Sequence, residues 1–260
     1  LSTIEQCGPL ARAIRQGNVY AQLEQLRHAK LVGKENIGPF LEEVGMSTNA
    51  DDHVYDGTDM SAGFDPLLAY NRNSSLIPSL LSEGVTHLQV RPEPGEDIFA
   101  GQGGLVRLDE GLLADSPRVV YVHLGETGWK RAGKSRAAAM QKLLGNLDEA
   151  KLYAANKKAY QNNRLRELSL SLSDLDALAD VLSRKKKLAI YVDRAAEIEA
   201  VLEALDTYDL DIVLLGAREA WMVSAAISER GIPVVINVMD NRPSSFDRLG
   251  VRLDQAKILH

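Results

Sequence analysis

Short, nearly continuous apolar runs recur along the chain after residue 83. They occupy residues 84–90, 119–124, 187–193, 211–216 and 232–238. Runs without polar alternation are typical of strands that are buried on both faces of a parallel sheet. We therefore expect an α/β fold whose sheet contains these segments.

Amphipathic segments separate the last three runs and predict helices over residues 194–208 and 218–231. The three strands begin near Leu188, Ile212 and Val234, so a strand–helix unit recurs about every 22 to 24 residues. This period fits a (β/α) TIM-type barrel, in which each helix returns the chain to the neighbouring strand. A doubly wound sheet shows the same alternation, and the period alone leaves it open. We prefer the barrel.

The earlier part of the chain is organised differently. Apolar residues at helical spacing predict an N-terminal helical segment within residues 1–40. Residues 45–75 are rich in Asp, Asn, Gly and Ser, which predicts a long loop with a binding or lid role. We assign residues 41–260 to one barrel domain, within which a tight turn is predicted at three glycines, Gly101, Gly103 and Gly104.

Composition and charge argue against nucleic-acid and membrane partners, and we expect a small-molecule or dipeptide-like substrate. A net charge of −6 and an isoelectric point near 5.5 argue against a nucleic-acid surface. No stretch approaches the length of an apolar membrane span, and we expect a soluble homo-oligomer. A single cysteine, Cys7, excludes an internal disulfide, which favours the cytoplasm. Because the first residue is not Met, a periplasmic location after removal of a leader stays open.

One stretch, GWKRAGKS at residues 128–135, matches the G-x-x-x-x-G-K-[ST] pattern of phosphate-binding P-loops. Three residues separate the preceding strand from Gly128, whereas a phosphate loop leaves its strand directly. Trp129, Lys130 and Arg131 are also bulky for a backbone that wraps closely around phosphates. We interpret the string as a chance match in a barrel loop and keep a P-loop NTPase as the less favoured alternative.

Four segments resemble the amidohydrolase superfamily, near its imidazolonepropionase-like and prolidase-like members. They are AYNRNSSLIPSLLSEGVTHLQVRPEPGEDIFAGQGGLVRLDEG, LGETGWKRAGKSRAAA, IYVDRAAEIEAVLEAL, and IVLLGAREAWMVSAAISERGIPVVI followed by NRPSSFDRLGVRLDQAKIL. The resemblance implies a barrel, in agreement with the strand–helix period. It also implies metal-dependent hydrolysis of a C–N bond in an amide, cyclic amide or dipeptide, with a divalent metal ion such as zinc as cofactor.

The metal ligands that the resemblance implies are incomplete in this sequence. The family uses an H-x-H pair, a carboxylate or modified lysine, two further histidines and an aspartate, whereas this chain contains no H-x-H. Tyr191 stands at the strand-five position and Gly216 at the strand-six position. The chain also ends at His260, before the expected eighth strand. We therefore expect either an incomplete barrel or a lineage without the metal site, and the alternative function is a non-catalytic binding or scaffold protein.

Two residues around the end of the second apolar run are the candidate metal ligands. Glu126 matches the carboxylate that related proteins present after a central strand, and His123 lies at the strand end. A surface carboxylate that pairs with Lys130 or Arg131 is the alternative for Glu126. A buried histidine of the core is the alternative for His123.

Acidic residues and arginines follow each of the last three strands. Asp193 and Arg194 are the candidate catalytic residues, although an Asp at this place could also cap the following helix. Strand ends of a barrel converge on one rim, which would suit a small zwitterionic or carboxylated ligand. The candidate substrate-binding residues on that rim are Tyr191, Arg218, Asp240 and Arg242.

Overall fold

The computed structural model describes residues 54–74, 76–82, 84–108, 111–112, 118–162, 168–237 and 249–259. The predicted N-terminal helical segment and two of the substrate-binding candidates, Asp240 and Arg242, lie outside these ranges. In the described ranges, no helix combines the length and apolarity required to cross a membrane.

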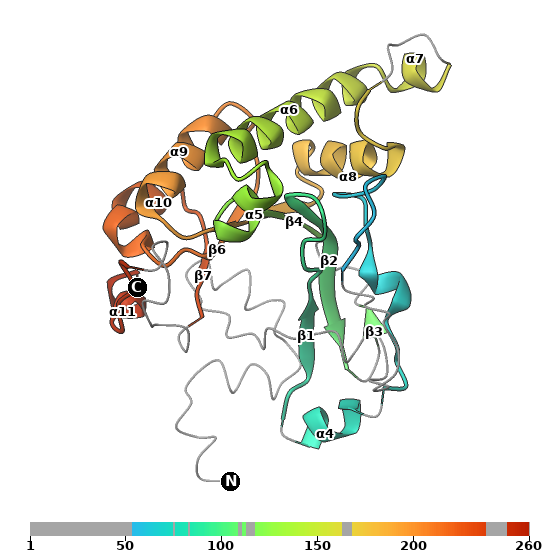
Figure 1. Ribbon diagram of the computed structural model, residues 1–260. Helices are drawn as coiled ribbons and strands as arrows, with labels where there is room; N and C mark the ends of the chain where they lie inside the picture. Colours follow the sequence, from blue (N-terminus) through green and yellow to red (C-terminus); the bar gives the residue numbers. More distant parts are fainter. Residues whose placement is uncertain are drawn as a thin grey trace.

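A mixed sheet forms the centre of the described fold (Figure 1), with strands in the order β1-β2-β4-β5-β6-β7. β2 (Phe99–Arg107) runs antiparallel to both of its neighbours, β1 (His87–Val90) and β4 (Val119–His123). The short β3 (Gly111–Leu112) pairs with the end of β2. The sequence correctly places β1 and β4, but β1 is antiparallel to its partner rather than a strand of the parallel part.

The parallel part of the sheet begins at β4 and continues through β5 (Lys187–Val192), β6 (Ile212–Gly216) and β7 (Val234–Val235). These strands are neighbours in the same order as in the chain, which is how a (β/α) barrel is wound. The α/β class and the consecutive parallel strands are thus confirmed, and the described sheet is compatible with part of a barrel.

Helices connect the parallel strands. Between β4 and β5 the chain forms α5 (Glu126–Arg131), α6 (Arg136–Ala155), α7 (Lys157–Gln161) and α8 (Leu172–Leu182). α9 (Ala195–Leu205) joins β5 to β6, and η3 (Ala220–Val223) with α10 (Ser224–Glu229) joins β6 to β7. The remaining elements are η2 (Pro66–Ala69), α4 (Leu76–Ser82) and α11 (Gln255–Leu259).

The two faces of the parallel strands have different surroundings, because side chains alternate along a strand. One face packs against the helices in the main core, to which the strands contribute Val120, Val122, Leu188, Ile190, Val192 and Leu214. We call the opposite face the inner face, because it would line the interior of a closed barrel. It carries a smaller apolar cluster that contains Tyr121, Ala189 and Leu215, with Tyr191 packed against it.

The glycines of residues 101–104 lie within β2, so the predicted tight turn is wrong. Gly101 has a φ of 125° at a register shift between β2 and β4, a conformation that glycine adopts readily. A Cβ at Gly103 would lie 2.2 Å from the carbonyl oxygen of Val90 and 2.7 Å from the ring of Tyr121. Glycine is therefore required because β2 passes closely between these neighbours.

The P-loop-like string does not form a phosphate loop. Gly128 to Arg131 belong to helix α5, and Ser135 caps helix α6 by accepting a hydrogen bond from the backbone N–H of Ala138. A Cβ at Gly128 would lie 1.8 Å from the carbonyl oxygen of His123, so this glycine allows α5 to pack against the end of β4. The geometry contradicts the NTPase alternative.

Candidate functional site at the strand ends

Aromatic and cationic side chains gather on the inner face near the carboxyl ends of β4 and β5. His123 and Tyr191 are paired in the parallel register, and their rings stack with centroids 4.2 Å apart and an interplanar angle of 16°. The guanidinium carbon of Arg91, which follows β1, lies 4.9 Å from the centre of the Tyr191 ring. We call His123, Tyr191 and Arg91 the His123 cluster.

The imidazole of His123 is buried and uncharged. Only 5% of the residue is exposed, and its Nε2 has no hydrogen-bond partner within the described part of the chain. Burial lowers the pKa of His123 to about 3, with further contributions from the positive charges of Arg91 and Arg131. The ring therefore stays neutral across the physiological pH range.

The two arginines that act on His123 were not identified in the sequence. Arg91 donates a hydrogen bond of 2.7 Å to Glu93, and its side chain is 16% exposed. Arg131 donates to three backbone carbonyls, at 2.8 Å to Pro94, at 3.2 Å to Thr127, and to Gly95. These bonds attach the end of α5 to the segment that follows β1, so both arginines are held in place.

Tyr121 lies on the inner face two residues before His123. Its hydroxyl accepts a hydrogen bond of 2.9 Å from the amide of Gln89 on β1. Burial raises the pKa of Tyr121 to about 12, although the bond from Gln89 and the charge of Arg91 oppose this shift. Tyr121 is thus a neutral phenol that links β1 to β4 beneath the cluster.

Asp193 and Arg218 form an ion pair next to the cluster, where β5 and β6 end. The Nη1 of Arg218 lies 2.5 Å from Oδ2 of Asp193, and each side chain is 14% exposed. Gly216 has a φ of 75°, and a Cβ there would lie 2.8 Å from Oδ1 of Asp193. The positive φ and the close approach both favour glycine at the end of β6.

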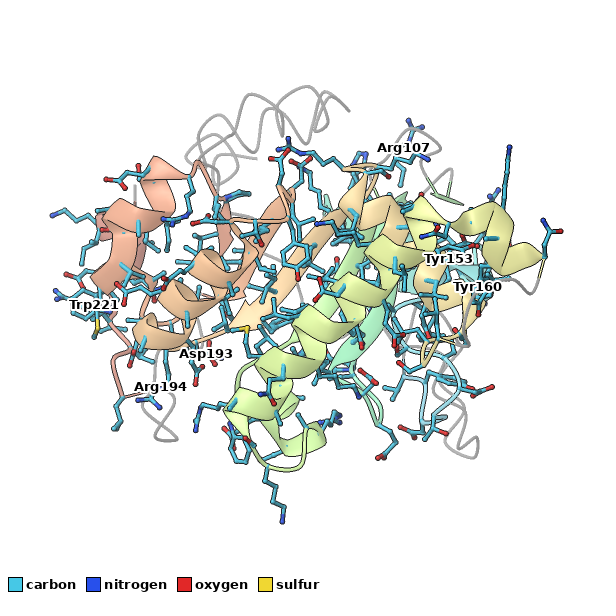
Figure 2. The ribbon with its side chains drawn as sticks, turned by 90° about the horizontal axis from the view of Figure 1, so that it is seen from above. Arg107, Tyr153, Tyr160, Asp193, Arg194 and Trp221 are labelled. Atoms are coloured by element: carbon cyan, nitrogen blue, oxygen red, sulfur yellow. The ribbon has the colours of Figure 1, made fainter. Side chains whose placement is uncertain are left out.

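The alternative that Asp193 caps helix α9 is wrong. Arg194 occupies the cap position without a side-chain bond, and it is exposed at the point where β5 runs into α9, beside Asp193 (Figure 2). The backbone N–H of Ala195, at the start of the helix, donates instead to the side chain of Glu219 at 2.9 Å. Asp193 pairs with Arg218 on the rim, and Glu219 supplies the cap.

The described residues do not fit a metal centre. They contain no group of three or more His, Cys, Asp or Glu side chains that could hold an ion. Glu126 forms an ion pair of 2.8 Å with Lys130 on α5, as its alternative interpretation expected. The positive charges of Arg91 and Arg131 also oppose a cation at His123. Metal binding by Glu126 and His123 stays a prediction.

These features define an α/β protein with barrel-type winding and with ionisable side chains at the carboxyl ends of its parallel strands. No protein-family model matches the sequence, and the curated proteins give no match. Among solved structures, the chain is similar to an amidohydrolase from Thermotoga maritima MSB8, with a TM-score of 0.72 and 19% identity. The match covers 88% of this chain and 61% of that protein, so the chain spans less than two thirds of its neighbour's length. At this identity the similarity shows the fold.

Proposed function

We propose that the chain carries part of an amidohydrolase-like barrel that hydrolyses a C–N bond in an amide, cyclic amide or dipeptide. The observation that carries the proposal is the position of the Asp193–Arg218 pair. Its side chains converge at the carboxyl ends of β5 and β6, beside the aromatic and cationic His123 cluster. Barrel enzymes place their reacting groups at this rim.

In this proposal Asp193 is the catalytic carboxylate. It receives the proton of the attacking water and returns it to the leaving nitrogen, so an amide and water become a carboxylic acid and an amine. Arg218 holds the carboxylate of Asp193 in place, and the exposed Arg194 contacts the substrate from the neighbouring position. Tyr191 binds the substrate through its ring. A metal ion, zinc first, remains part of the family expectation, and no step is assigned to it here.

An amine-release assay on the full-length protein tests this function. N-acyl amino acids, dipeptides and cyclic amides are supplied with and without added zinc or manganese, and free amine is measured. Asp193→Asn should lower turnover by about 10² to 10⁴-fold, the usual contribution of a general acid–base group. Arg252→Met, which alters an exposed ion pair with Asp254, is the control. Turnover that survives in Asp193→Asn, or no turnover of any substrate, contradicts the proposal.

A non-catalytic binding protein is the second candidate, and Tyr191 favours it. At the position where the resemblance implies a histidine ligand, a tyrosine stacks on His123 instead. Binding of a small acid or peptide that depends on Arg194 or Arg218, without amine release, would support this alternative.

A further inference from the structure

A buried nitrogen on the inner face has no partner among the described residues. Nε2 of His123 makes no hydrogen bond to any of them, although the residue is only 5% exposed. A buried polar atom without a partner costs about 1–3 kcal/mol, and native proteins contain few of them. A ligand that bonds to this nitrogen would remove the cost.

The charges around His123 indicate the sign of that ligand. The guanidinium of Arg91 lies over the Tyr191 ring that stacks on His123, and Arg131 is attached to the segment that follows β1, so both positive charges lie near the imidazole. Their field opposes a divalent cation and attracts an anion.

The two arginines differ in how their charges are balanced. Arg91 shares its charge with Glu93, which is 36% exposed. The hydrogen bonds of Arg131 all go to backbone carbonyls, and no carboxylate of the described residues neutralises it. Among the described residues, Arg131 thus adds a positive charge near His123 that no carboxylate contact offsets.

The shape of the arginine side chain favours a carboxylate among the possible anions. An arginine guanidinium is planar and matches the two oxygens of a carboxylate. The Tyr191 ring holds Arg91 in position through a cation–π contact and also stacks on His123. An imidazole nitrogen on β4, a guanidinium that directly follows β1 and the Tyr191 ring on β5 thus belong to one cluster.

We propose that the His123 cluster is a subsite for a carboxylate group of the ligand, in which Arg91 and the Nε2–H of His123 donate to the carboxylate oxygens and Arg131 adds positive field. This inference rests on the proposed function, since it names the substrate class of the same rim: amides that carry a free carboxylate. The sequence favoured a carboxylated ligand for the rim, but it indicated His123 as a candidate metal ligand, so the place of the carboxylate was not evident from it.

Isothermal titration of the full-length protein with a matched ligand pair tests the subsite. N-acetylglycine carries the carboxylate, and N-acetylglycinamide is its neutral counterpart. We expect the acid to bind about tenfold or more tightly than the amide, since charge-assisted bonds are the stronger ones. Equal affinities for the two compounds, or no binding of the acid at millimolar concentration, would overturn the inference.

A pair of matched arginine variants locates the binding. Arg91 stacks over Tyr191 and pairs with Glu93 two residues on; Arg252 stacks over Trp221, at 4.6 Å, and pairs with Asp254 two residues on. Arg91→Met should weaken binding of N-acetylglycine about tenfold or more, and Arg252→Met should leave it unchanged. The reverse pattern, or no effect of Arg91→Met in a folded protein, refutes the assignment.

His123→Phe separates the subsite from a metal centre and from a folding defect. Phenylalanine keeps the stack on Tyr191 and removes the nitrogens, so the variant should be at least as stable as the parent while it loses affinity for N-acetylglycine. Titration with zinc should give no heat that depends on His123; stoichiometric zinc binding that His123→Phe abolishes would overturn the inference. If the acid binds but no amine is released, the subsite is supported and the proposed hydrolysis is refuted. If neutral amides release amine as fast as carboxylated ones, the hydrolysis is supported and the subsite is refuted.

Discussion

Two glycine-to-alanine substitutions in neighbouring helices should have opposite effects on stability. Gly128 is buried in α5, and an added Cβ would lie 1.8 Å from the carbonyl oxygen and 2.4 Å from the carbonyl carbon of His123. Both atoms belong to the backbone of β4 and cannot rotate away. Ordinary contact begins at 3.4 Å, so α5 would have to move by about 1.6 Å, the difference between these distances.

The magnitude follows from overpacking and helix propensity. Overpacking costs about 1–3 kcal/mol, and a clash with backbone atoms belongs to the upper part of that range, about 2–3 kcal/mol. Alanine recovers about 0.5–1 kcal/mol in a helix, so Gly128→Ala should lower the free energy of unfolding by about 1–2.5 kcal/mol. Gly145 lies exposed within α6 with nothing within 4 Å of an added Cβ. Gly145→Ala should therefore raise stability by about 0.5–1 kcal/mol.

Urea denaturation followed by circular dichroism measures both effects in one series. The slopes of the unfolding curves should stay the same, so that the midpoints alone report the change. If Gly128→Ala proves as stable as the parent, α5 does not pack on the end of β4 as described. A loss of stability in Gly145→Ala would equally contradict the position of that residue on the exposed face of α6.

Three further predictions use buried polar groups. Asp174 accepts bonds of 2.8 Å from the N–H of Ser61 and 2.7 Å from that of Gly63, so Asp174→Ala should lower the free energy of unfolding by about 2–4 kcal/mol in a denaturation series, since two donors lose their acceptor. Arg218→Met should lower the free energy of unfolding by about 3 kcal/mol, because the mostly buried carboxylate of Asp193 loses this cation. In a double-mutant cycle, addition of Asp193→Asn should recover part of that loss. Since the folded pKa of His123 is depressed from 6.5 to about 3, the unfolded state binds the proton more readily, and stability should fall as the pH drops from about 6.5 towards 3. This pH dependence, about 1.4 kcal/mol per pH unit, should be absent in His123→Phe. Denaturation curves of both proteins at several pH values measure it, and the same pH dependence in the two would refute the prediction.

The strands of the parallel sheet could be read from the sequence because burial on both faces leaves a continuous apolar run. β4, β5 and β6 agree with the predicted segments to within one or two residues. β2 was not predicted as a strand. Its glycines are required by close contacts with neighbouring residues, and those neighbours are distant in the sequence. β7 is shorter than its run of apolar residues suggests.

The candidate site was predictable in part. The convergence of Asp193 and Arg218 follows from the rule that parallel strands end at one edge, and the structure brings them together. Arg91 and Arg131 could not be found in this way, because their influence on His123 depends on the antiparallel β1 and on the packing of α5. One signal was present: Arg91 continues the alternation of Gln89 along β1, and Gln89 bonds to Tyr121 on the inner face.

His123 contacts both the cluster and helix α5. Its ring belongs to the His123 cluster, whereas Gly128 of α5 packs closely against its carbonyl oxygen. A shift of the end of β4 would therefore displace the first turn of α5. Trp129 directly follows Gly128, so its indole would move as well. Because the chain has only two tryptophans, the emission of Trp129 offers an intrinsic optical readout of events at the imidazole.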